Sequence, residues 1–248
     1  MPTYLETVQL LASAQKDAAR GAPAYSRFVN RRLGRLLAAW AFRRGLSPNA
    51  VTGLSALATF GGIAATALLA PAWWVGVLVA VLLVLGYALD SADGQVARLT
   101  GRGSPAGEWL DHVVDATKIS AMPLALLVGW YRFDAVDRAW LLVPIVHAVV
   151  GPVYFFAMIL TEQLRRAHGV RSTAAPGGRL PWLRSLVALP TDYGVLCLLF
   201  LLYGWISGFV VLYGLVVLAT AVYLALALGK WFREMGRLGA SAGGAPAA

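Results

Sequence analysis

Charged residues are scarce in this sequence. They make up 13% of its 248 residues, while 59% are hydrophobic. An average soluble domain has about 25% charged residues, and the mean hydropathy here is +0.67. These values argue against a soluble domain and indicate an integral membrane protein.

Acidic residues are scarcer still, with 12 Asp and Glu against 21 Lys and Arg and a net charge of +9. A basic chain can bind nucleic acid, but here the basic residues flank apolar runs, so we expect a lipid bilayer as partner and no nucleic acid.

The single cysteine, Cys197, cannot form an intrachain disulfide and is interpreted as a small apolar helix residue. The opening residues, MPTYLETVQLLASAQKDAARG, lack the pattern of a cleavable signal peptide. We identify neither a lipidation motif nor an internal repeat.

Long apolar runs, in contrast, are abundant. A spanning helix needs roughly 20 apolar residues, and backbone groups in lipid must be paired within the segment, so the spans should be helical. We expect six spans, at about 50–70, 74–98, 108–131, 139–161, 186–205 and 208–229. The predicted fold class is an all-α integral membrane protein with six transmembrane helices, preceded by an N-terminal amphipathic interfacial helix.

The basic residues follow these spans. Six spans place 18 of the 21 Lys and Arg on one side, with Arg132 and Arg138 on the other and Lys118 inside the third span. Basic loops are cytoplasmic. We therefore expect a multi-pass protein of the cell inner (plasma) membrane, with both termini on the cytoplasmic side.

Residues 25–46 have a different pattern. Val29, Leu33, Leu36, Leu37 and Trp40 recur at helical spacing, with arginines largely elsewhere on the helix, which is typical of a helix lying on an anionic leaflet. A soluble, packed helix is the alternative. The expected organisation is a mobile segment at 1–24, an amphipathic juxtamembrane helix at 25–46, a six-helix catalytic membrane domain at 47–232 and a cytoplasmic tail at 233–248.

The stretch LDSADGQVARLTGRGSPAGEWLDHVVD, residues 89–115, carries four aspartates among apolar runs. Helical spacing places one set of residues on one face of the second span: Asp90, Asp93, Gly94, Ala97 and Arg98. The same spacing places Gly107, Asp111 and Asp115 on one face of the third span. Because a short loop joins the two helices, we expect antiparallel neighbours whose acidic faces meet within about 12 Å of the cytoplasmic mouth.

Four carboxylates cannot share a small cavity without counter-charge. Two Mg²⁺ or Mn²⁺ ions would balance them, because oxygen-only ligands favour such hard cations, and two such ions suit phosphoryl chemistry. Gly94 and Gly107 leave room for a ligand or allow close helix contact. Arg98 is expected to bind a phosphate, and snorkelling to the interface is the alternative.

These residues resemble the signature of the CDP-alcohol phosphotransferases, in which every signature position and the eight-residue gap match. SPNAVTGL at 47–54 also resembles the stretch before the first span in that family. The resemblance implies that Asp90, Asp93 and Asp111 hold metals, and that Asp115 is the general base and also touches a metal. It implies that Gly94, Ala97, Arg98 and Gly107 shape the CDP site, and that the enzyme is a homodimer.

Three further residues are auxiliary candidates. His112 lies in SPAGEWLDHVVD, which resembles SPLGELFDHGCD of eukaryotic choline and ethanolamine phosphotransferases, and it either assists catalysis or orients and packs. Lys118 either pairs with Asp115 or binds the acceptor. Asp192 either binds the acceptor or caps a helix after Pro190.

The predicted function is metal-dependent transfer of a phosphatidyl group from a CDP-alcohol, CDP-diacylglycerol being favoured, to an alcohol acceptor with release of CMP in phospholipid synthesis. One alternative reverses the parts, with a CDP-choline or CDP-ethanolamine donor and diacylglycerol as acceptor. An intramembrane prenyltransferase is disfavoured because both acidic motifs flank one loop. A cation transporter is disfavoured because the sequence shows no repeated halves.

Overall fold

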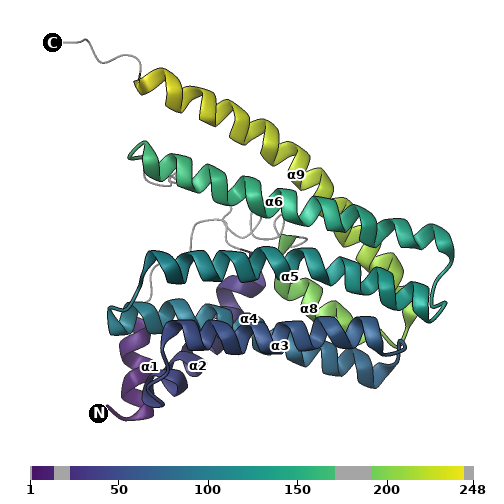
Figure 1. Cartoon of the computed structure of the whole chain (residues 1–248), viewed down its shortest axis with the longest axis horizontal. Helices are drawn as coiled ribbons and strands as arrows, with labels where there is room; N and C mark the ends of the chain where they lie inside the picture. Colours follow the sequence, from purple (N-terminus) through teal and green to yellow (C-terminus); the bar gives the residue numbers. More distant parts are fainter. Residues whose placement is uncertain (1, 14–22, 171–190, 243–248) are drawn as a thin grey trace.

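The chain is all-helical in its described parts. The computed structural model describes residues 2–13, 23–170 and 191–242. The helices are α1 (Tyr4–Ser13), the π-helix η1 (Ser26–Asn30), α2 (Arg31–Arg43), α3 (Pro48–Leu68), α4 (Trp73–Thr100), α5 (Pro105–Arg132), η2 (Arg138–Leu141), α6 (Leu142–Ala167), α8 (Tyr193–Leu199), η4 (Phe200–Leu202) and α9 (Ile206–Ala242) (Figure 1).

Turn chemistry in the sequence fixes where the helices nearest the acidic stretch begin and end. Ser47 and Ser104 cap α3 and α5, each accepting a hydrogen bond from a backbone amide of the first turn, and Pro follows each cap. Ser caps and Pro at the first helical position are favoured at helix starts. Gly101 ends α4 with φ +66°, a left-handed conformation that glycine adopts without strain. The α4–α5 connection is therefore as short as the sequence predicts.

Five helices are long and apolar enough to cross a membrane: Pro48–Leu68, Trp73–Thr100, Pro105–Arg132, Arg138–Ala167 and Ile206–Leu238. They match five of the six expected spans. The expected fifth span, 186–205, is described only from residue 191, where Tyr193–Leu202 forms a shorter apolar helix. Residues 186–190 lie outside the described part, so the count of six stays a prediction.

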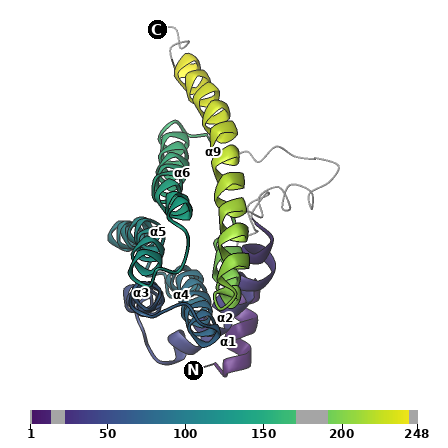
Figure 2. The ribbon, with the colours of Figure 1, turned by 90° about the vertical axis from the view of Figure 1, so that its right-hand side faces the viewer.

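The five long helices form one elongated bundle. In chain order, α3 packs on α4 and α5, α5 on α6, and α6 on α9; Figure 2 shows this succession from the end of the bundle. The start of α3, the α4–α5 connection and the C-terminal ends of α6 and α9 all lie toward the same end (Figure 1). That end carries the acidic stretch.

Small residues allow the closest helix contacts. A Cβ at Gly86 of α4 would meet the Thr59 hydroxyl of α3, and one at Gly129 of α5 would meet the carbonyl oxygen of Thr66. Small residues at such crossings let helix backbones approach closely. Close packing of this kind stabilises helix association in a bilayer, where the hydrophobic effect does not act between helices. α3 thus holds α4 and α5 on either side. α4 and α5 do not themselves pack extensively, which differs from the expectation of direct neighbours.

Two apolar clusters flank the acidic stretch. One, toward the far end, gathers α3, α4, α5, α8, η4 and α9 around Trp130, Phe200 and Phe209. The other joins α1, α2, α3 and α4 around Ala38, Val51 and Leu89. The acidic side chains lie between them on rigid helices, which suits a site that must hold its geometry.

The N-terminal segment is partly ordered. Residues 4–13, within the segment expected to be mobile, form α1 and pack against α2. α2 packs against α4 through Gly34 and Ala38, whereas the apolar side chains of Leu36 and Trp40 are exposed. This arrangement is compatible with an interfacial helix, which stays a prediction. α9 continues as one helix across the expected domain boundary at 232/233.

Candidate active site

A cavity of about 710 Å³ opens between α3 and the α4–α5 hairpin. Its lining includes six of the eight signature residues: Asp93, Gly94, Ala97, Arg98, Gly107 and Asp111. A Cβ at Gly94 would lie 3.3 Å from the Arg98 guanidinium, and one at Gly107 would lie 3.2 Å from the Asn49 side-chain oxygen. Both glycines therefore leave space in the cavity wall that a side chain would crowd.

Asp93 is buried and fixed by two neighbours. Its Oδ2 accepts a hydrogen bond of 2.6 Å from the Thr52 hydroxyl of α3, and its Oδ1 accepts one from the Gly94 amide. A carboxylate held by donors on both oxygens has one preferred orientation. Thr52 is not among the residues predicted from the sequence, although it lies within the SPNAVTGL stretch that carries part of the resemblance.

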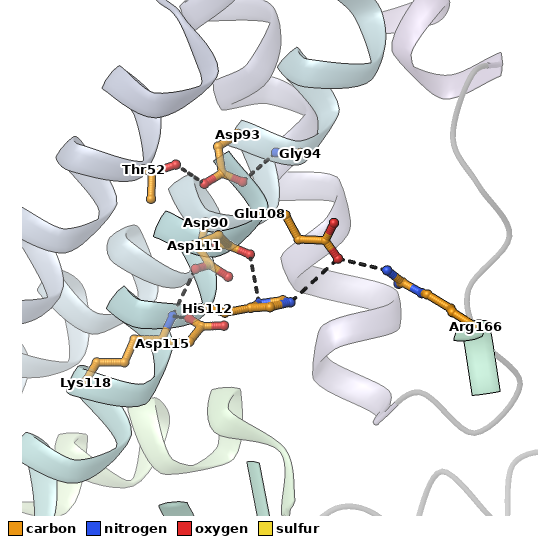
Figure 3. A network of polar contacts seen from close by, with 10 residues as sticks. All are labelled: Thr52, Asp90, Asp93, Gly94, Glu108, Asp111, His112, Asp115, Lys118 and Arg166. Carbon is orange, nitrogen blue, oxygen red and sulfur yellow. Dashed lines mark hydrogen bonds and ion pairs between the residues drawn. The ribbon is translucent and has the colours of Figure 1, made fainter. Parts of the chain in front are cut away.

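Asp90 and Asp115 meet deeper in the bundle, beyond the cavity lining. The Lys118 ammonium lies between them, 3.0 Å from Asp90 Oδ1 and 2.5 Å from Asp115 Oδ1 (Figure 3). Asp90 is on α4, whereas Asp115 and Lys118 are on α5, so this contact links the two helices. Of the two predicted interpretations of Lys118, pairing with Asp115 is confirmed.

Asp111 lies at the junction of the cavity with a second set of charges. His112 Nδ1 is 3.7 Å from Asp111 Oδ2, and His112 Nε2 is 3.9 Å from Glu108. Glu108 in turn forms an ion pair of 2.9 Å with Arg166 of α6 (Figure 3). The His112 ring also packs edge-on against Phe155. These contacts support the interpretation in which His112 orients and packs.

Asp192 lies apart from the cavity. Its carboxylate is buried and accepts hydrogen bonds from the backbone amides of Tyr25 and Ser26 at 2.8 and 3.3 Å, and from that of Gly194 at 3.1 Å. Asp192 therefore joins the start of α8 to the segment before α2. This supports the capping interpretation.

The donor set fits a hard divalent cation. Ligand atoms of Asp111, His112 and Asp115 lie within 4.8 Å of one another. The carboxylates of Asp90 and Asp93 are on α4, on the other side of this group (Figure 3). Oxygen-rich sites of this kind suit Mg²⁺ or Mn²⁺. The Lys118 ammonium lies between the carboxylates of Asp90 and Asp115, where it offsets part of their negative charge.

Comparison with known proteins identifies the family. The family model described as CDP-alcohol phosphatidyltransferase matches residues 45–231. The chain belongs to this family. Among solved structures, it is similar to phosphatidylinositol phosphate synthase from Mycobacterium tuberculosis, crystallised with CDP-DAG bound, at 24% identity, a TM-score of 0.54, and coverage of 82% of this chain and 94% of that chain. That similarity shows the fold. A search of curated protein sequences gives no match.

Membership confirms the resemblance drawn from the signature. The chain is a membrane transferase of phospholipid synthesis, and phosphatidyl transfer from a CDP-alcohol is the activity that the family supports. CDP-alcohol phosphatidyltransferases use divalent metal ions, for which the Asp-rich group is the candidate site. The finer assignments, to particular substrates and residues, are proposals.

Proposed function

We propose that this chain transfers a phosphatidyl group from CDP-diacylglycerol to a polar alcohol and releases CMP. The observation that carries the proposal is the cavity beside α4 and α5, where Asp93 and Asp111 share a wall with Gly94, Arg98 and Gly107. A volume of about 710 Å³ is within the usual range for small-molecule sites. The cavity lies at the end of long apolar helices, where a lipid and a water-soluble alcohol can both arrive.

The donor would bind along the cavity wall. Arg98 projects from the last turns of α4 and would pair with a phosphate of the CDP group, since a guanidinium matches phosphate oxygens bidentately. Gly94 and Ala97 would let the nucleotide approach the α4 backbone. Gly107 would do the same on α5.

The four aspartates divide into two roles. Asp90, Asp93 and Asp111 would hold two divalent cations together with Asp115. When bound, such cations neutralise charge on the diphosphate and on the departing CMP. Asp115 would accept the proton of the attacking hydroxyl, and its contact with Lys118 holds this carboxylate toward α4.

The orientation in the membrane follows from charge. The end of the bundle with the cavity also carries the arginines of α2 and the Arg165 and Arg166 pair. We place this end, with both termini, on the cytoplasmic side of the inner membrane. A homodimer is the oligomeric state proposed.

A second candidate has its own sequence observation. The SPAGEWLDH segment resembles the corresponding segment of enzymes that use small CDP-alcohols, and His112 lies 3.7 Å from Asp111. In this version CDP-ethanolamine or CDP-choline donates to diacylglycerol.

The deciding experiment measures CMP release by the purified full chain in lipid nanodiscs with Mg²⁺. CDP-diacylglycerol and CDP-ethanolamine are offered separately, each with a panel of acceptors. Release from CDP-diacylglycerol with one polar alcohol supports the proposal and names the product. Release only from CDP-ethanolamine with diacylglycerol supports the second candidate. If folded protein releases no CMP from either donor, both candidate functions are contradicted.

A further inference from the structure

Lys118 is the most enclosed charged side chain near the site. It is 4% exposed and does not line the cavity. Its ammonium contacts Asp90 on α4 and Asp115 on α5, and it lies 5.6 Å from the centre of the Tyr193 ring of α8. Three helices thus meet at one cation that lies outside the cavity lining.

This burial has a physical reason. Removing an ammonium from water is costly unless charged or hydrogen-bonding partners replace the water. Here two carboxylates and the face of an aromatic ring replace it, and the ring adds a cation–π attraction. The carboxylates gain as well, because Asp90 and Asp115 would otherwise face each other with like charge.

We propose that Lys118 is an internal cation of the site that positions Asp115 and competes with divalent cations for the oxygens of Asp90 and Asp115. The inference rests on the proposed function only for the roles of these two aspartates. The ammonium ties Asp115 to α4 across two helices that do not pack extensively against each other. When divalent cations bind, the same carboxylates are shared, so Lys118 weakens metal binding while it fixes the proposed base.

The two effects separate when the charge is removed. Lys118→Met keeps a long apolar side chain but leaves the site more negative, so divalent cations should bind more tightly. Asp115 loses its link to Asp90, so turnover should fall. General loss of structure would weaken metal binding and turnover together, and it therefore gives a different result.

The experiment measures Mn²⁺ binding to the full chain in nanodiscs by electron paramagnetic resonance, without any nucleotide. For Lys118→Met we expect a Kd for Mn²⁺ at least about tenfold lower than that of the wild type. We also expect kcat at saturating Mn²⁺ to be at least about tenfold lower. Lys118→Arg keeps the charge and should bind Mn²⁺ like the wild type. Lys230→Met, on the exposed side of α9, is the matched control and should change neither quantity.

Several results would overturn the proposal. In one, Lys118→Met is folded but binds Mn²⁺ no more tightly than the wild type does. In another, Lys118→Arg binds Mn²⁺ as tightly as Lys118→Met does. If Lys118→Met fails to fold even with Mn²⁺, the double variant Lys118→Met/Asp90→Asn decides. Restored folding supports the charge pairing, and continued failure contradicts it. Because Mn²⁺ binding needs no turnover, a wild type that releases no CMP counts against the proposed function alone.

Discussion

The Thr52 hydroxyl of α3 donates a 2.6 Å hydrogen bond to Oδ2 of Asp93 on α4. The bond joins the first long helix to the signature helix at the cavity wall. A hydrogen bond to a charged group is worth roughly 1.5–3 kcal/mol. It therefore fixes one oxygen of a proposed metal ligand from a helix that carries no signature residue.

Thr52→Val should lower turnover at limiting Mg²⁺ by about tenfold, because Asp93 loses the donor that orients it. Thr52→Ser keeps the hydroxyl and should retain most of the activity. Steady-state CMP release across a Mg²⁺ titration distinguishes the two variants. Equal activity of the Val and Ser variants would show that this hydrogen bond does not matter to the site.

Asp93→Asn should weaken metal binding, because a neutral amide replaces a carboxylate ligand. We expect the Mg²⁺ concentration for half-maximal CMP release to rise by about tenfold or more. Asp137→Asn, in the connection at the opposite end of the bundle, is the matched control. An unchanged metal requirement in Asp93→Asn would contradict the assignment of Asp93 as a ligand.

Asp115→Asn should abolish measurable turnover, since an amide cannot accept the proton of the acceptor hydroxyl. Binding of the CDP donor should change little, because Asp90, Asp93 and Asp111 would still hold the metals. Equilibrium binding of the donor and single-turnover CMP release separate the two effects. Turnover at the wild-type rate would remove Asp115 as the base.

Gly94→Ala should raise the KM for the CDP donor by about tenfold with little change in stability. The added methyl would enter the cavity wall and meet only the Arg98 side chain, which can move. Gly229→Ala, where nothing lies within 4 Å of a new Cβ, is the control. A KM like that of the control would mean that the donor does not approach this part of α4.

Asp192→Ala should lower stability rather than chemistry. The carboxylate caps α8 and holds the backbone amides of Tyr25 and Ser26, so its loss should lower the unfolding temperature by about 5 °C. Asp137→Ala is a fitting control, because Asp137 precedes η2 without a side-chain cap. A variant with normal stability but a higher KM for the acceptor alcohol would instead support the acceptor-binding interpretation.

Much of the membrane topology follows from the sequence because its causes are local. Apolar runs of the required length predict α3, α4 and α5 within a few residues. They also predict where α6 and α9 begin, but both helices continue well past the expected ends at 161 and 229. The expected fifth span is described only from residue 191, where Tyr193–Leu202 forms a shorter apolar helix. α1 was not predicted, because it is held by its contact with α2 and not by a local signal.

The sequence by itself indicated the family through its resemblance to the signature, and helical periodicity placed the signature residues on defined helix faces. Only the tertiary structure decided which of these residues share the cavity. Asp93 and Asp111 line it, whereas Asp90 and Asp115 lie deeper around Lys118. It also showed that Thr52 contacts Asp93 and that Asp192 caps α8. The physical reason is that helix crossings and burial depend on contacts between segments far apart in the chain, and periodicity within one helix carries no information about them.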